Sequence, residues 1–169
     1  MTALKVGLVC VVALALQLTV FVDVHIDGVA PELLALVAVL AGSSAGADRG
    51  SVIAFGVGLL WDIYLPTPLG LAAISFALVA YAVGGLEAGL FHDTRVQVAV
   101  LAFVGTASTL VIYTVLGELV GQRGLVSGDL VRIVLVASLV NSVLAPFVAP
   151  AVQWAVRLDL RRHPTAVNR

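Results

Sequence analysis

The stretch RGSVIAFGVGLLWD, from Arg49 to Asp62, decides how this chain folds. Only apolar and small residues lie between its two charged ends, and the run from Gly50 to Trp61 makes a helix roughly 18 Å long at about 1.5 Å per residue. A hydrocarbon core is about 30 Å thick, so the helix has to include Asp62 and continue to Leu65. The break Pro66-Thr67-Pro68 then ends it. A carboxylate is therefore predicted about one turn inside the end of a membrane helix.

Asp62 continues a row of small residues, Gly50, Ala54 and Gly58, at four-residue spacing. Residues four apart lie on one face of a helix, so the carboxylate shares its face with the small residues. Small residues let neighbouring helix backbones approach closely, and a carboxylate facing lipid is costly. The row therefore predicts a face that packs against protein.

The composition is that of an integral membrane protein with a single membrane domain, residues 1–169. The chain is 61% hydrophobic and 11% charged, with a mean hydropathy of +1.13. The net charge of −1 gives no field that would attract nucleic acid. The single cysteine, Cys10, excludes an intrachain disulfide and any multi-cysteine metal site.

Apolar blocks predict an all-α bundle of six transmembrane helices, at approximately 3–22, 30–47, 50–65, 68–88, 96–120 and 130–157. The first block is interpreted as a retained helix rather than a signal peptide, because its apolar run is long and no small-residue cleavage site follows. A re-entrant hairpin formed by the second and third blocks would leave the number of crossings even. We consider this hairpin disfavoured because Arg49, at its tip, would lie inside the membrane.

Basic residues predict that both termini are cytoplasmic. With six crossings, one side holds Lys5, Arg49, Arg95 and the tail arginines Arg157, Arg161, Arg162 and Arg169, while Arg123 and Arg132 lie on the other. The tail also suits the anionic inner leaflet of a membrane.

No enzymatic function, cofactor or metal is predicted. The sequence Gly42-Ser43-Ser44-Ala45-Gly46 matches the nucleophile motif G-x-S-x-G, but all three histidines fall at helix ends or in the tail. Ala38, Gly42 and Gly46 are interpreted instead as a close-packing face. Asp23, His25 and Asp27 are the densest group of potential metal ligands, and they are better explained as a solvated loop.

Several segments together resemble the MreD family, the rod-shape-determining membrane proteins of bacteria. The resembling residues are Gln17, Pro31-x-Leu33-Leu34, Arg49-Gly50, Gly56-x-Gly58-Leu59-Leu60-Trp61-Asp62, Pro68-Leu69-Gly70 and Tyr81. Specific family motifs match only over residues 17–81. Beyond these residues the chain resembles the family only in its series of apolar helices. These residues, with Ala54 and the polar Asn141 of the last helix, are candidates for a structural or partner-binding role.

The resemblance implies a non-enzymatic membrane scaffold or regulator of the cell-elongation complex, which supports lateral peptidoglycan synthesis. It implies partners such as the single-span MreC, the actin-like MreB, the RodA glycosyltransferase and a class B penicillin-binding protein. It also implies a fold similar to the substrate-binding subunits of energy-coupling-factor transporters, so a vitamin-binding membrane subunit is the main alternative. A proton-coupled transporter using Asp62 is a third possibility, although no second ionisable residue at depth would relay the proton. A homo-oligomer is also compatible with the sequence.

Overall fold

Six α-helices make up the computed structural model, which describes residues 2–19, 29, 31–90, 94–122 and 128–156. They are α1 (Thr2–Thr19), α2 (Leu33–Ala45), α3 (Ala47–Tyr64), α4 (Leu71–Leu90), α5 (Arg95–Leu119) and α6 (Leu130–Val156). Neither these helices nor the connections that the structure describes form a β-sheet. The all-helical prediction is therefore confirmed, and the predicted helices correspond one to one with the observed ones.

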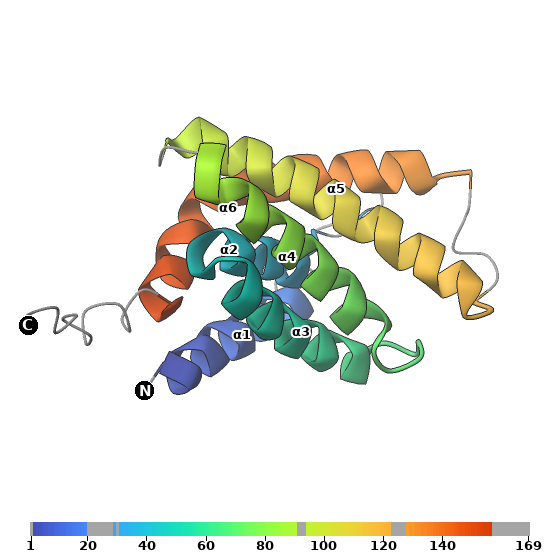
Figure 1. Cartoon of the computed structure of the whole chain (residues 1–169). Helices are drawn as coiled ribbons and strands as arrows, with labels where there is room; N and C mark the ends of the chain where they lie inside the picture. The colour runs from blue at the N-terminus through green and yellow to red at the C-terminus, as the bar shows by residue number, and fades with distance from the viewer. Residues whose placement is uncertain (1, 20–28, 30, 91–93, 123–127, 157–169) are drawn as a thin grey trace, which may run out of the picture.

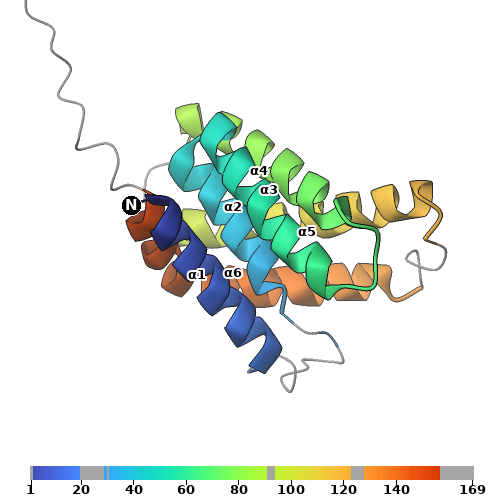
Figure 2. The same ribbon diagram turned by 90° about the horizontal axis from the view of Figure 1, so that it is seen from below.

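The shortest helix, α2, lies at the centre of the molecule (Figures 1 and 2). Every residue from Leu33 to Gly42 is buried, so α2 is apolar on all sides and is surrounded by the other five helices. Helices α5 and α6 pack lengthwise against each other on one side of it, as Figure 1 shows. Helix α1 lies against α2 and α6 on another side, and α3 and α4 complete the enclosure.

Helices α2, α3 and α4 form the most closely packed part of the bundle, because glycines let their backbones touch. A Cβ atom at Gly42 would overlap the backbone of Ala80 in α4, and one at Gly50 would overlap the backbone of Gly42. At Gly58, a Cβ atom would overlap the backbone of Ala72 and Ala73. The expected close approach on the row of Gly50, Ala54, Gly58 and Asp62 is present, and all four residues are buried.

The helix boundaries differ from the predicted ones at three starts. Helix α2 begins at Leu33 rather than near residue 30, because Pro31 and Glu32 are held in non-helical backbone by side chains from other helices. Helix α3 begins at Ala47 rather than at residue 50, with Asp48 in its first turn, where a carboxylate suits the helix dipole. Helix α4 begins at Leu71 rather than near residue 68, after the turn that contains Pro66 and Pro68.

Gly46 was expected to belong to a packing face of one helix, but it lies in the turn between two helices, where its backbone closely approaches Gly84 of α4. It is the single residue between α2 and α3, with φ of +80° and no neighbouring atom within 4 Å of its hypothetical Cβ. A positive φ is accessible to glycine without steric cost, so Gly46 allows the chain to reverse at once. The other two members of the expected face, Ala38 and Gly42, are buried as predicted.

Two helices, α5 and α6, are long and apolar enough to cross a membrane by length and composition. The apolar parts of α1, α2 and α4 are shorter. Each end of α1 is held by one side chain. Near its last turn, Gln17 hydrogen-bonds to the Pro31 carbonyl. Near its first turn, Nζ of Lys5 lies 4.5 Å from the centroid of the Trp154 ring in α6. Six crossings remain a prediction. The cluster of Asp23, His25 and Asp27, Arg123 and the arginine tail lie outside the described residues.

Substitution of Gly58 by Leu should prevent proper folding, because the new side chain would have to occupy the space of the α4 backbone. We expect a loss of about 3 kcal/mol or more in the free energy of unfolding. Gly56→Leu is the matched control, since Gly56 lies on the exposed face of α3 with open space around it. The measurement is thermal or denaturant unfolding of the purified variants in mild detergent. Equal destabilisation by both substitutions would contradict the packing described here.

Candidate functional site: two helix starts capped by other helices

The most distinctive polar contacts in the bundle lie where α4 begins, and Asp62 of α3 makes them. The carboxylate is 1% exposed. Its Oδ2 accepts hydrogen bonds from the backbone N–H of Gly70 at 2.9 Å and of Ala73 at 3.1 Å, and its Oδ1 accepts one from Ala72 N–H at 3.0 Å. Asp62 therefore caps the start of a helix to which it does not belong.

This cap replaces one that the local sequence lacks. Gly70 stands at the N-cap position of α4 and has no side chain to accept the first helical N–H groups. It has φ of +101°, which suits glycine. The remaining N–H of this turn, that of Leu71, is directed to the Pro68 carbonyl at 3.3 Å. Every backbone N–H from Gly70 to Ala73 thus has an acceptor, as the buried residues 71–73 require.

The electrostatics of the contact favour a carboxylate. The N-terminus of a helix carries a partial positive charge from its aligned peptide dipoles and its free N–H groups. Asp62 lies at that end of α4, and its two oxygens are both used. On the other side of the same corner, the Tyr113 hydroxyl of α5 lies 3.3 Å from Thr67 Oγ1 and donates to it. The turn between α3 and α4 is therefore held from both α3 and α5.

The start of α2 is held in a similar way, by two amide side chains. Gln17 of α1 donates from Nε2 to the Pro31 carbonyl at 2.6 Å and accepts the N–H of Leu33 on Oε1 at 2.8 Å. Asn141 of α6 donates from Nδ2 to the Glu32 carbonyl at 2.8 Å and to Thr106 Oγ1 at 3.1 Å. The backbone of three consecutive residues, 31 to 33, is thereby hydrogen-bonded to side chains of α1 and α6.

Two buried polar atoms in this region have no hydrogen-bond partner among the described residues. They are Oγ of Ser138 and Oδ1 of Asn141, which lie one turn apart on α6. The neighbouring hydroxyls of Thr109 and Thr114 donate to carbonyls of their own helix.

The structure sorts the residues singled out in the sequence into four groups. Gln17, Pro31 and Asn141 meet at the start of α2, and Asp62, Pro68 and Gly70 meet at the start of α4. Gly50, Ala54 and Gly58 lie inside the contacts of α3 with α2 and α4. Arg49, Gly56 and Tyr81 are exposed. Sequence reasoning missed Glu32 and Thr67, because their roles depend on a backbone carbonyl and on a distant tyrosine.

The arrangement offers no catalytic constellation within the described residues. No group of three or more His, Cys, Asp or Glu side chains there could hold a metal ion. Ser44 of the G-x-S-x-G sequence lies in the last turn of α2, and the three histidines are outside the described part of the chain. What the site does chemically is satisfy backbone groups at two buried helix starts.

Comparison with protein families agrees with this architecture. The family model of the rod shape-determining protein MreD matches residues 2–154. The chain belongs to the MreD family. The match extends through all of α1 to α5 and nearly all of α6, well beyond residues 17–81, where the resemblance is most specific. No curated protein and no solved structure gave a match. Membership of the MreD family makes the chain a rod-shape-determining protein of the bacterial membrane, from a family that is not a known enzyme family.

Removal of the Asp62 carboxylate should destabilise the fold in a graded way. Asp62→Ala leaves three backbone N–H groups without an acceptor, and we expect a loss on the order of 3 kcal/mol. Asp62→Asn keeps one oxygen for Gly70 and Ala73 but turns an NH₂ group toward Ala72 N–H, so a loss of about 1 to 2 kcal/mol is expected.

Reversible unfolding in detergent measures the effect, with Asp48→Ala as a control. Asp48 is an exposed carboxylate in the first turn of α3, and its loss should cost at most about 1 kcal/mol. An Asp62→Ala protein as stable as the wild type would show that the cap is unimportant for the fold.

Proposed function

We propose that this protein is a non-enzymatic scaffold of the bacterial cell-elongation complex, which binds its partners through contacts between membrane helices. The observation that carries the proposal is the family match over residues 2–154, together with the way the buried polar side chains are used. Gln17 and Asp62 direct the hydrogen bonds that the structure describes for them to the backbone of the same chain. A transporter or receptor would need such groups for its ion or ligand.

The partners proposed are a single-span protein of the MreC kind and, directly or through the complex, MreB, RodA and a class B penicillin-binding protein. Large apolar side chains on the outward faces of the helices are available for such contacts, among them Val52, Ile63 and Leu78. The exposed candidates Arg49, Gly56, Pro68 and Tyr81 are the members of the sequence set that a partner could reach. The buried candidates would act through the fold.

The alternative of a vitamin-binding subunit related to energy-coupling-factor transporters has less support. Such a site needs a cavity with several convergent polar groups. Ser138 Oγ and Asn141 Oδ1 are the uncommitted buried polar atoms among the described residues, and both come from a single helix. The large pocket between α4 and α5 is lined by apolar residues apart from Ser108.

We propose the cytoplasmic membrane of a bacterium as the location, with six crossings and both termini in the cytoplasm. The distribution of basic residues supports this orientation. In the structure, the α2–α3 turn with Arg49 lies near the last turns of α4, since a Cβ at Gly84 would overlap Gly46 and Ala47. That turn and the first residue of α5, Arg95, would then face the cytoplasm together.

Capture of a partner in mild detergent tests the proposed function. We expect the tagged protein to retain a single-span coiled-coil protein and to restore rod shape in cells depleted of their own MreD. Asp62→Asn should keep both properties because much of the cap survives, whereas Asp62→Ala should weaken both. A well-folded Asp62→Asn protein that still captures its partner but no longer supports rod shape would favour proton-coupled function. Recovery of a bound vitamin with no protein partner would favour the receptor.

Cysteine labelling of intact cells tests the orientation, after Cys10 has been replaced by serine. An impermeant maleimide should label a cysteine at Gln122, at the far end of α5, and should leave a cysteine at Arg49 unlabelled. Both positions follow from the predicted placement of their helix ends on opposite sides. If position 49 were labelled in intact cells and position 122 were not, the orientation of the protein would be the opposite of the one proposed.

A further inference from the structure

The outward face of α3 is apolar over a short length, and the structure shows both of its limits. Large apolar side chains cover this face, from Val52 at 72% exposed to Ile63 at 73% exposed. At one end, the exposed carboxylate of Asp48 stands in the first helical turn. At the other end, the helix stops at Tyr64 and the chain continues through non-helical residues 65–70, among which two prolines and a leucine are exposed.

These limits set the greatest thickness of hydrocarbon that α3 can cross. A short charged side chain cannot reach out of the hydrocarbon from within it, and non-helical backbone is not found exposed to lipid there. The rise from Asp48 to Leu65 is about 26 Å, or about 24 Å at an average helix tilt of about 20°. A typical hydrocarbon core is about 30 Å thick, so the face of α3 is too short for it by roughly 4 to 6 Å.

Helix α4, which packs beside α3, has a similar limit. Its apolar part, Leu71–Leu86, rises about 24 Å. Ile74 and Leu78 are exposed on it. The two helices therefore share a short apolar face.

Helices α5 and α6, on the side of the bundle away from α3, are apolar over a greater length. Between Arg95 and Glu118 of α5 no residue is charged, over a rise of about 35 Å. A tilt of about 30° fits that length to a core of about 30 Å. Residues Ile133–Val156 of α6 are also uncharged. In both Figures 1 and 2, the end of α5 and the start of α6 extend beyond the corner between α3 and α4.

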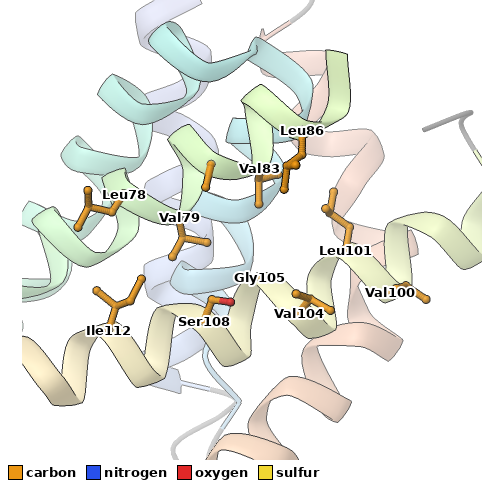
Figure 3. Close-up of a pocket in the computed structure, with 11 residues that line it drawn as sticks. Leu78, Val79, Val83, Leu86, Val100, Leu101, Val104, Gly105, Ser108 and Ile112 are labelled. Atoms are coloured by element: carbon orange, nitrogen blue, oxygen red, sulfur yellow. The ribbon is translucent and has the colours of Figure 1, made fainter. Parts of the chain in front are cut away.

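No polar barrier separates the short face from the long one where α4 and α5 meet. Figure 3 shows the pocket between them, lined by residues of α4 from Leu78 to Leu86 and of α5 from Val100 to Ile112. Ser108 provides the single polar side chain of this lining. Lipid tails can therefore surround the two faces without a break, so the thickness of the bilayer has to change around the protein.

The residues at the two limits of α3 suit the headgroup layers of a bilayer. Trp61 and Tyr64 stack in the last turn, with ring centroids 6.1 Å apart, and Tyr64 is 58% exposed. Tryptophan and tyrosine are enriched at the membrane–water interface, because each has an apolar ring and a polar group. At the other limit, the exposed Arg49 can bind lipid phosphates. Both ends of the face therefore fit lipid headgroups.

We propose that the bilayer is thinned along α3 and α4, and that this face selects phospholipids with shorter acyl chains than those around α5 and α6. The inference rests on the six crossings proposed above. A chain too long for the face raises the free energy of the lipid layer, so shorter chains gather there. A partner helix that covers the face removes the mismatch, so the thinning also favours the helix contacts of the proposed scaffold.

Two matched single-tryptophan proteins compare the faces by fluorescence quenching. Trp61 and Trp154 are replaced by Phe in both. Phe55→Trp then reports on α3 and Phe147→Trp on α6, since both phenylalanines are exposed. Each protein is reconstituted with a phosphatidylcholine brominated at mid-chain, and unlabelled dimyristoleoyl or dierucoyl phosphatidylcholine competes with it.

We expect the shorter dimyristoleoyl chains to relieve quenching of the Phe55→Trp protein at least about twofold more effectively than the longer dierucoyl chains, because they match α3. The Phe147→Trp protein should show no such preference. An equal preference at the two positions, with both tryptophans quenched, would overturn the thinning and leave the crossings intact. If brominated lipid did not quench the Phe55→Trp protein at all, the crossing by α3 would be contradicted, and the thinning with it.

A second measurement uses the unmodified protein and does not depend on how the variants fold. The protein is bound to an antibody fragment in a dioleoyl phosphatidylcholine nanodisc and imaged by cryo-electron microscopy. The two headgroup layers should lie closer together beside α3 than beside α5, by about 4 Å or more. Equal spacing of the layers on the two sides would also overturn the proposal.

Discussion

The contact of the Asp62 carboxylate with the first turn of α4 is the constraint on which the central packing depends. A helix that begins inside a bundle presents several N–H groups that water does not reach, and each has to find an acceptor within the protein. Asp62 supplies acceptors for three of them. Because the carboxylate comes from α3, the same contact fixes the angle between α3 and α4. This is what brings Gly58 onto the backbone of Ala72 and Ala73.

The central helix α2 is governed by the same rule, with amides in place of a carboxylate. Its 13 residues make a helix of about 20 Å, shorter than a hydrocarbon core of about 30 Å, so a membrane crossing at this position also needs the non-helical residues before Leu33. Its first residues are therefore surrounded by protein, and Gln17 and Asn141 hydrogen-bond to them from α1 and α6. An amide suits this position because it donates to a carbonyl and accepts from an N–H at once, as Gln17 does.

These contacts explain how an MreD-family chain could serve as a scaffold without an active site. Its buried polar groups largely hold the short helices in register, so the outer faces of the bundle remain apolar and fixed in shape. A rigid surface of that kind favours selective helix contacts, because little conformational freedom is lost on binding.

The sequence by itself determined the helical class, the number of helices and the inward face of α3. These follow from local periodicity: Gly56 and Gly58 lie two residues apart, and the helical repeat is enough to place one outside and the other inside. The sequence also marked Gln17, Asp62 and Asn141 as unusual, since polar groups in apolar helices seldom face lipid. It did not show that Gly46 forms the turn between α2 and α3, because that depends on where α2 ends.

Only the tertiary structure decided which groups these side chains bind. Asn141 and Glu32 are separated by 109 positions, and Tyr113 and Thr67 by 46. Such pairs depend on how whole helices pack, and no local pattern encodes them. The same holds for Asp62: its position on the inward face was readable from the spacing, but its choice of Gly70, Ala72 and Ala73 depends on where α4 begins. Periodicity is a property of one helix, whereas a cap supplied from another helix is a property of the folded bundle.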